Sequence, residues 1–157
     1  MSRFAIDLGS LRQGSTRVEL EGDALDLDLP EDGWAGAIRG AFDVEKTGEK
    51  VSVRGAVTAT ARLECVRCLA AFDRPVRVAL EVFAERAGSG RARDEAELER
   101  DAYMRFHDGR QLDLREEARE VLLLELPMSP HCREDCRGLC PKCGADRNEG
   151  PCGCPEG

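Results

Sequence analysis

The feature that most constrains this chain is the spacing of its eight cysteines. Six lie in the tail, at C-x3-C-x3-C-x2-C-x8-C-x-C spacing from Cys132 to Cys154, and the other two form a C-x2-C pair at Cys65 and Cys68. Two thiolates separated by two residues on a tight turn can face one tetrahedral ion, and two such pairs fill its four positions. The cysteine pattern therefore predicts metal binding.

The segment from Cys140 to Gly144 has the sequence of a zinc knuckle. Pro141 stiffens the turn, and Gly144 permits positive φ where the chain folds back under the metal. This segment is the sharpest local signal in the tail, and it favours zinc as the metal.

Eight cysteines can form two sites of four thiolates each. In the partition that we favour, the ligands of one site lie within fifteen residues of the tail, and the other site joins the tail to the pair Cys65 and Cys68. These two sets are Cys140, Cys143, Cys152 and Cys154, and Cys65, Cys68, Cys132 and Cys136. A competing partition groups the cysteines from Cys132 to Cys143 and leaves Cys65 and Cys68 with Cys152 and Cys154. His131 is an alternative ligand in place of Cys132 or Cys136.

Other readings of the cysteines stay open at this point. Both sites are closed by protein thiolates, which is the structural zinc pattern, although an iron–sulfur cluster also accepts four thiolates. Cys65 and Cys68 could also be two small buried side chains. A thioredoxin-like redox role needs a C-x-x-C that opens a helix, whereas this pair joins two expected strands. We expect two structural zinc ions.

The N-terminal residues lack an apolar signal-peptide core, and no apolar run approaches the roughly 20 residues of a membrane helix. We therefore expect a cytoplasmic protein that does not enter the membrane. We also expect the chain to be a monomer. Disulfides are rare in the cytoplasm, so the eight cysteines are better explained as metal ligands.

Alternating apolar and polar residues predict a chain of β-strands. A short strand is expected from Phe4 to Leu8, followed by short apolar runs at residues 18–20 and 25–29. Longer strands are expected at residues 35–45, 51–65 and 76–82, with a glycine-containing turn at residues 46–50 and a bulge at Gly55. The pair Cys65 and Cys68 then lies at the tip of a hairpin between two long strands.

One helix is predicted near residues 113–126, with Asp113 as its N-cap and Glu116 completing a capping box. Its buried stripe comprises Leu114, Ala118, Val121 and Leu122.

The predicted fold is α+β: a mainly antiparallel β-sheet with one C-terminal helix and a cysteine-rich, zinc-binding tail. Residues 1–130 form the β-rich domain, with a mobile loop near 86–101, and residues 131–157 form the tail packed on the hairpin at 65–68.

Charge and composition limit the function. The formal charge is −8, and aromatic residues make up only 4% of the chain, which argues against a generic electrostatic or base-stacking nucleic-acid binder. A local basic patch remains possible, and its candidate RNA contacts are Arg67, Arg133, Arg137, Lys142 and Arg147, with Arg62 and Arg74 near the hairpin. The alternative is a solvated surface of mixed charge, because acidic residues intervene. His107 is expected to be exposed in a turn.

No nucleophile elbow, phosphate loop or supported acid–base pair is present, so we expect no enzymatic activity.

The sequence does resemble the bacterial YceD family. The resemblance lies in the segment from Leu63 to Leu69 with Phe72, in the helix residues from Asp113 to Leu124, in Leu126-Pro127, and in the tail from Cys132 to Cys154. The tail contributes Gly138-Leu139-Cys140-Pro141, Cys143-Gly144 and Asn148-Glu149-Gly150. The resemblance covers Ile6 to Cys154, although Arg147 stands where many members carry an aliphatic residue.

The resemblance implies a role in ribosome biogenesis, because YceD proteins support the accumulation or processing of large-subunit ribosomal RNA. The partner implied is large-subunit ribosomal RNA or a large-subunit ribosomal protein. Relatives that keep the first C-x2-C and a later His-Cys without the tail cysteines imply that Cys65, Cys68 and Cys132 share one site. Two kinds of function follow: a non-enzymatic assembly factor that touches RNA, or a zinc-stabilised adaptor that binds a ribosomal protein.

Overall fold

A computed structural model describes residues 3–86 and 104–154 of the chain. It contains a five-stranded sheet in the order β2-β3-β4-β5-β6 and a two-stranded sheet of β1 and β7. All neighbours are antiparallel except β5 and β6, which are parallel. The strands are β1 Ala5–Asp7, β2 Gly14–Gly22, β3 Trp34–Thr47, β4 Lys50–Glu64, β5 Ala71–Arg86, β6 Met104–His107 and β7 Gln111–Asp113.

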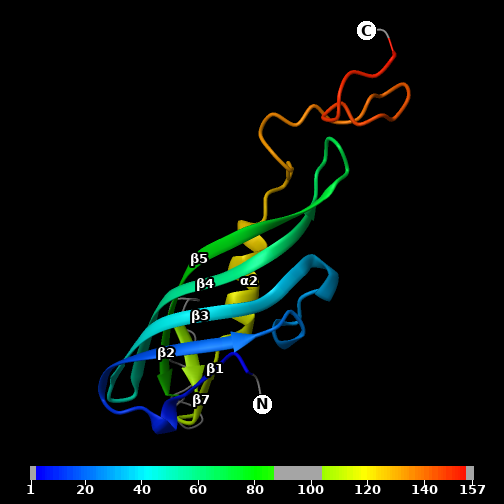
Figure 1. Ribbon diagram of the computed structural model, residues 1–157. Helices are drawn as coiled ribbons and strands as arrows, with labels where there is room; N and C mark the ends of the chain where they lie inside the picture. The colour runs from blue at the N-terminus through cyan, green and yellow to red at the C-terminus, as the bar shows by residue number, and fades with distance from the viewer. Residues whose placement is uncertain (1–2, 87–103, 155–157) are drawn as a thin grey trace.

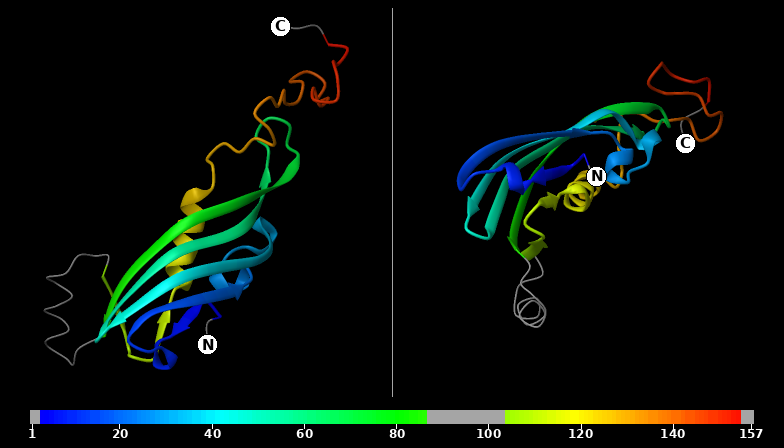
Figure 2. Two further views of the ribbon diagram at one scale, coloured as in Figure 1. Left: turned by 60° about the vertical axis from the view of Figure 1, so that its left-hand side comes forward. Right: turned by 90° about the horizontal axis from the view of Figure 1, so that it is seen from below.

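The single layer of long strands is covered on one face by helix α2, Arg115–Glu125, and the tail extends beyond the tip of the β4–β5 hairpin (Figures 1 and 2). Three short 3-10 helices, η1 Leu8–Ser10, η2 Leu25–Leu27 and η3 Glu31–Gly33, connect the first strands. The predicted fold class, a mainly antiparallel sheet with one helix before a cysteine-rich tail, is therefore confirmed, although the apolar run at 25–29 begins in η2 rather than in a strand.

The core lies between the inner face of the sheet and helix α2. Side chains of a strand alternate between its two faces, so buried residues recur at every second position over much of β3, β4 and β5. On β4 these include Val51, Val53 and Val57, as the alternation predicted. The helix contributes Ala118 and Leu122, both 0% exposed. Full burial of a valine or leucine side chain stabilises the folded state by about 1.5–3 kcal/mol relative to leaving it exposed.

Gly55 pairs in register with Phe42 and Leu80, so the bulge expected at this glycine was wrong. The irregularity in the β3–β4 ladder falls instead between Ala35 and Arg39. Gly55 is needed for close packing: a Cβ there would lie 2.0 Å from the carbonyl oxygen of Ala41 and 2.8 Å from Cα of Phe42. The ring of Phe42 also packs edge-on against Phe4, with centroids 6.3 Å apart.

Helix α2 begins one residue later than predicted. Its N-cap is Leu114, which makes no side-chain cap hydrogen bond, and Asp113 belongs to β7. The carboxylate of Asp113 nevertheless accepts a 2.9 Å hydrogen bond from the backbone N–H of Arg115. One N–H of the first turn is therefore satisfied from β7, which anchors the start of the helix at the edge of the small sheet. Among the described residues no helix is long and apolar enough to cross a bilayer.

His107 is buried, with 6% of its surface exposed, so its expected exposure was wrong. It ends strand β6, and its Nε2 lies 3.0 Å from the carbonyl oxygen of Glu49, while Nδ1 accepts from the N–H of Gly109. Two hydrogen bonds thus tie the ring to the β3–β4 turn and to its own turn. Residue 86 of the mobile loop predicted at 86–101 ends strand β5, and the rest of that loop lies outside the described residues.

Candidate metal centres

The first C-x2-C lies at the tip of the β4–β5 hairpin, where the ladder ends at Glu64 and Ala71. The N–H of Cys65 donates to the carbonyl of Ala70 at 2.9 Å, and the N–H of Leu69 donates to the carbonyl of Cys65 at 2.9 Å. Leu69 adopts a φ of 63°, a left-handed conformation that costs a non-glycine residue about 1 kcal/mol or more. These bonds fold Cys65 and Cys68 toward the same side of the turn.

The tail repeats this turn with the same hydrogen-bond spacing. The N–H of Cys140 donates to the carbonyl of Ala145 at 2.8 Å, and the N–H of Gly144 donates to the carbonyl of Cys140 at 2.9 Å. Gly144 takes the left-handed conformation, with φ 76°, at the position that corresponds to Leu69. The knuckle predicted for Cys140 to Gly144 is therefore present, and the hairpin tip is a second copy of its backbone.

The eight cysteines form two groups of four, and the sulfur atoms of each group lie within 4.8 Å of one another. The groups are Cys65, Cys68, Cys132 and Cys136, and Cys140, Cys143, Cys152 and Cys154. We refer to them as the first and the second cysteine group. This is the partition that the sequence favoured, and the competing grouping is not formed. All eight cysteines are free thiols.

The sulfur geometry fits a metal ion. In the first group Cys65 Sγ lies 3.6 Å from Cys136 Sγ, and Cys68 Sγ lies 3.7 Å from Cys132 Sγ. Four sulfurs at about 2.3 Å from a tetrahedral ion are about 3.8 Å apart, so these separations match the edges of such a tetrahedron. Each group offers four thiol ligands, so the two groups are consistent with two metal ions per chain.

His131 is not a member of the first group, which the four cysteines complete without it. Its Nδ1 is buried and has no hydrogen-bond partner among the described residues. The structure thus gives no support to His131 as a replacement for Cys132 or Cys136.

The two groups differ in solvent contact. In the first, Cys65 is 0% exposed and Cys136 is 4% exposed, and Phe72 and Leu139 pack against the sulfurs. In the second, Cys140 is buried, Cys143 is exposed, and Cys152 and Cys154 are half-buried. The first group is therefore a small core in its own right, whereas the second lies near the surface of the tail.

Each group holds one thiol whose pKa is lowered. Burial, the largest influence on Cys65, raises its pKa, but backbone hydrogen bonds from Cys68, Cys132 and Arg67 and the thiol of Cys136 outweigh burial and lower it to about 5. Backbone hydrogen bonds from Cys143 and Lys142 lower the pKa of Cys140 to about 6. Because the thiolate is the form that binds metal, one sulfur in each group is prepared for ligation.

Backbone hydrogen bonds hold the tail against the hairpin tip. The N–H of Val66 donates to the carbonyl of Pro130 at 2.9 Å, and the N–H of Leu139 donates to the carbonyl of Arg67 at 3.0 Å. Gly138 has a φ of 76°, and a Cβ there would lie 3.0 Å from the Arg67 carbonyl oxygen. The tail thus approaches the hairpin closely enough that glycine is required at residue 138.

Asn148 has a contact that the sequence reasoning missed. Its side-chain nitrogen donates to Cys136 Sγ at 3.3 Å, and its side-chain oxygen accepts from the N–H of Arg137 at 2.9 Å. The neighbouring Arg147 lies beside the second group: hydrogen bonds to Cys140, and further interactions with Cys152, raise the pKa of its guanidinium. The sequence had marked Asn148 as part of the Asn148-Glu149-Gly150 motif of the family resemblance, but nothing in that motif indicated a contact with Cys136.

Arg67, Arg133 and Arg147, three of the candidate RNA contacts, interact with other groups of the molecule. Arg67 donates to the carbonyl of Cys136 at 3.0 Å, and Arg147 faces the sulfurs of the second group. Arg133 forms an exposed ion pair with Asp135 at 3.3 Å. Arg137 and Lys142 are exposed, and Arg137 lines a hollow of 520 Å³ beside Cys152 and Cys154.

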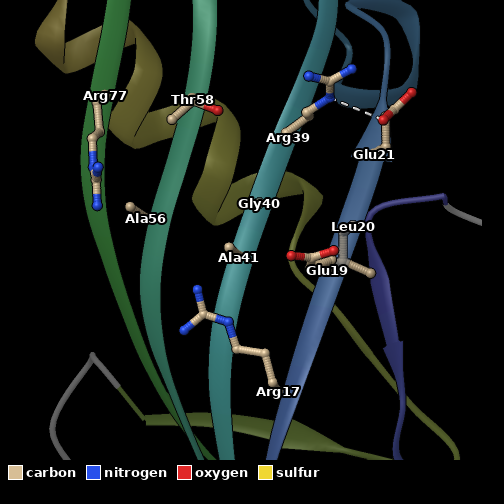
Figure 3. A pocket seen from close by; sticks show the side chains of 10 residues that line it. All are labelled: Arg17, Glu19, Leu20, Glu21, Arg39, Gly40, Ala41, Ala56, Thr58 and Arg77. Atoms are coloured by element: carbon tan, nitrogen blue, oxygen red, sulfur yellow. Dashed lines mark hydrogen bonds and ion pairs between the residues drawn. The ribbon is translucent and has the colours of Figure 1, made fainter.

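Another hollow, of 590 Å³, lies on the face of the sheet opposite helix α2 (Figure 3). Its floor includes Gly40, Ala41 and Ala56, and its rim carries charged side chains. Arg39 pairs with Glu21 at 3.0 Å, while Arg17 pairs with Asp43 at 3.0 Å. Its lining contains no cysteine or histidine, so it adds no metal ligand to the two groups.

Comparisons with known proteins agree with the resemblance seen in the sequence. A family model described as "Large ribosomal RNA subunit accumulation protein YceD" matches residues 53–157, a range that spans both knuckles and helix α2. An uncharacterised protein of Mycobacterium tuberculosis is 41% identical over 144 residues, which are 91% of this chain and 57% of that protein. An uncharacterised protein of Mycobacterium leprae is 38% identical over 119 residues, 75% of this chain and 52% of its own. The chain thus spans little more than half the length of these relatives, and no solved structure matches it.

Proposed function

The chain belongs to the YceD family, and from this membership we propose that it is a non-enzymatic factor that supports the accumulation or processing of large-subunit ribosomal RNA in the cytoplasm. The observation that carries the proposal is the family match over residues 53–157, which includes all eight cysteines. In this proposal the sheet of residues 1–130 is the scaffold, and residues 131–157, together with the hairpin tip at 65–68, are the functional head.

The proposal includes two structural zinc ions, one in each cysteine group. A four-thiol set with no position left for water is the pattern of structural zinc. The nearly tetrahedral separations in the first group and the repeated knuckle backbone support zinc, and all eight cysteines serve as ligands. Zinc in the first group would join the hairpin to the segment after helix α2.

We expect the purified, reduced chain to contain two zinc ions, because each group supplies a complete set of four ligands. Elemental analysis of protein prepared without chelators measures the metal content, and the variant Cys152→Ser should contain about one ion. Iron in place of zinc, or a reduced wild-type chain without metal, would contradict the assignment.

The partner of the head is proposed to be large-subunit ribosomal RNA. Arg137, Lys142 and Arg133 are exposed and are its candidate contacts, whereas Arg67 donates to the carbonyl of Cys136 and Arg147 faces the second cysteine group. Lysine and arginine that neutralise phosphates make binding weaken steeply as salt increases.

The alternative is an adaptor that binds a large-subunit ribosomal protein. The four acidic side chains between residues 131 and 154 and the internal use of Arg67 and Arg147 favour it, because both reduce the positive charge available to RNA. Ribosomal RNA accumulation would then be affected through the protein that the adaptor delivers or protects.

Crosslinking in cells, followed by sequencing of bound RNA and mass spectrometry of bound proteins, separates the two partners. The expected result is a discrete crosslink in large-subunit RNA that the double variant Arg137→Ala/Lys142→Ala weakens. The matched control is Arg17→Ala/Arg39→Ala on the sheet face, which should retain the crosslink. A ribosomal protein that is recovered after nuclease treatment, without specific RNA, would support the adaptor instead.

A further inference from the structure

Asn148 connects the two cysteine groups. The residue lies in the loop between Cys143 and Cys152 of the second group, yet its side chain contacts a sulfur of the first. Its neighbour Arg147 faces Cys140 and Cys152. Two consecutive residues therefore direct their side chains to two different groups.

The hydrogen bonds fix the orientation of the Asn148 amide. The backbone N–H of Arg137, at 2.9 Å, needs an acceptor, and of the two amide atoms only the oxygen can serve as one. The NH₂ group is therefore the one that faces Cys136 Sγ, at 3.3 Å. Cys136 is 4% exposed, so its sulfur receives this donor in a site largely closed to water.

The position of Asn148 depends on the folding of the second module. Its own N–H donates to Oδ1 of Asp146 at 2.9 Å, and the N–H of Arg147 donates to the carbonyl of Gly138 at 2.9 Å. Leu139 and Asp146 form a short β-bridge at the base of the same loop. When the cysteines of the second group are brought together, this loop is closed and the amide is held over Cys136.

We propose that Asn148 is a positioning residue for the first metal site, and that through it occupation of the second site strengthens metal binding at the first. The inference rests on the metal binding proposed above. A donor that bonds a thiolate stabilises the charged form that ligates the ion, and loss of such an outer partner lowers metal affinity by about 10–100-fold. Because coupling between two binding sites is reciprocal, the first site strengthens the second by the same factor.

The test is a comparison of metal affinities in the reduced full-length chain. Co²⁺ absorption and Zn²⁺ competition against a chromophoric chelator measure the metal affinities of the two sites. Cys65→Ser removes a ligand of the first site and thereby identifies the signal of the second. We expect Asn148→Ala to weaken the first site by about 10–100-fold. Cys152→Ser, which removes a ligand of the second site, should weaken the first site to a similar degree, and the double variant should add little further loss.

Two additional variants separate positioning from general destabilisation. Asn148→Asp keeps the oxygen that accepts from Arg137 but loses the donor to Cys136, so it should weaken the first site at least as much as Asn148→Ala. It should also shift the thiolate-to-cobalt absorption band of that site. Glu149→Ala changes the adjacent exposed side chain and should leave affinity and spectrum unchanged.

Two results would overturn the coupling. One is that the wild-type chain binds two ions and that the metal affinity of the first site is the same in Cys152→Ser as in the wild type. The other is Asn148→Asp with wild-type affinity and spectrum. If the wild-type chain binds no metal, the metal assignment fails as well, so the failure of the coupling alone is distinguishable from the failure of both.

Discussion

Replacement of Cys65 by serine is expected to release the tail from the hairpin while the sheet stays folded. Cys65 is fully buried in the first group, and this group links the hairpin tip to Cys132 and Cys136 of the segment after helix α2. Structural zinc contributes about 10–16 kcal/mol of apparent binding free energy in small modules. With the zinc proposed for the first group, loss of Cys65 would therefore remove most of what holds the tail in place. The core between the sheet and helix α2 does not depend on this group.

Hydrogen exchange measures this effect at individual amides. In Cys65→Ser the amides of Val66 and Leu139, which bond between tail and hairpin, should lose protection, whereas amides in the β3–β4 ladder keep theirs. In the matched variant Cys143→Ser, the amides of Cys140 and Gly144 should lose protection first. Identical exchange profiles for the two variants would contradict the assignment of Cys65 and Cys143 to separate sites.

Replacement of Gly55 by alanine is expected to destabilise the sheet strongly. The added methyl group would meet the carbonyl oxygen of Ala41 at 2.0 Å and Cα of Phe42 at 2.8 Å, so the backbones of β3 and β4 must separate. Overpacking typically costs about 1–3 kcal/mol, and a clash with backbone atoms rather than a flexible side chain places this case at the upper end. Urea unfolding of the metal-saturated chain, followed by circular dichroism, gives the change in the free energy of unfolding.

The matched control for Gly55→Ala is Gly33→Ala. A Cβ at Gly33 would lie 3.5 Å from the ring of Pro30, an ordinary contact, and its φ is not in the left-handed region. This variant should change the free energy of unfolding by less than about 0.5 kcal/mol. If the two variants unfold at the same urea concentration, the close approach of β3 and β4 at Gly55 is not the constraint that the geometry indicates.

The sequence predicted the parts of the fold that depend on local periodicity. Alternation located β3, β4 and β5, and a glycine turn between two alternating runs located the β3–β4 hairpin. It could not locate the role of Gly55, because a glycine in a strand signals a bulge and a close approach equally well. It also missed the burial of His107, which depends on a contact with Glu49, 58 residues away.

The candidate site was predicted to a similar extent. Spacing identified the eight cysteines, and the expected hairpin placed Cys65 and Cys68 together at its tip. The choice between the two partitions depended on how the chain after helix α2 returns to that tip, which no local pattern encodes. The contacts of Asn148 and Arg147 with the cysteines escaped prediction for the same reason, since they are set by the fold of the tail rather than by sequence spacing.

The length of the β4–β5 hairpin has an electrostatic consequence. Its ladder of fifteen residue pairs, from Lys50–Glu85 to Glu64–Ala71, spans about 50 Å at about 3.4 Å per residue. The screening length in physiological salt is about 8 Å, so charges near the β3–β4 turn exert almost no force on a molecule at the opposite tip. Between residues 131 and 154 the four basic and four acidic side chains balance, before any charge on the cysteines is counted. The formal charge of −8 therefore describes the chain as a whole, and a ligand at the head experiences a different, local field.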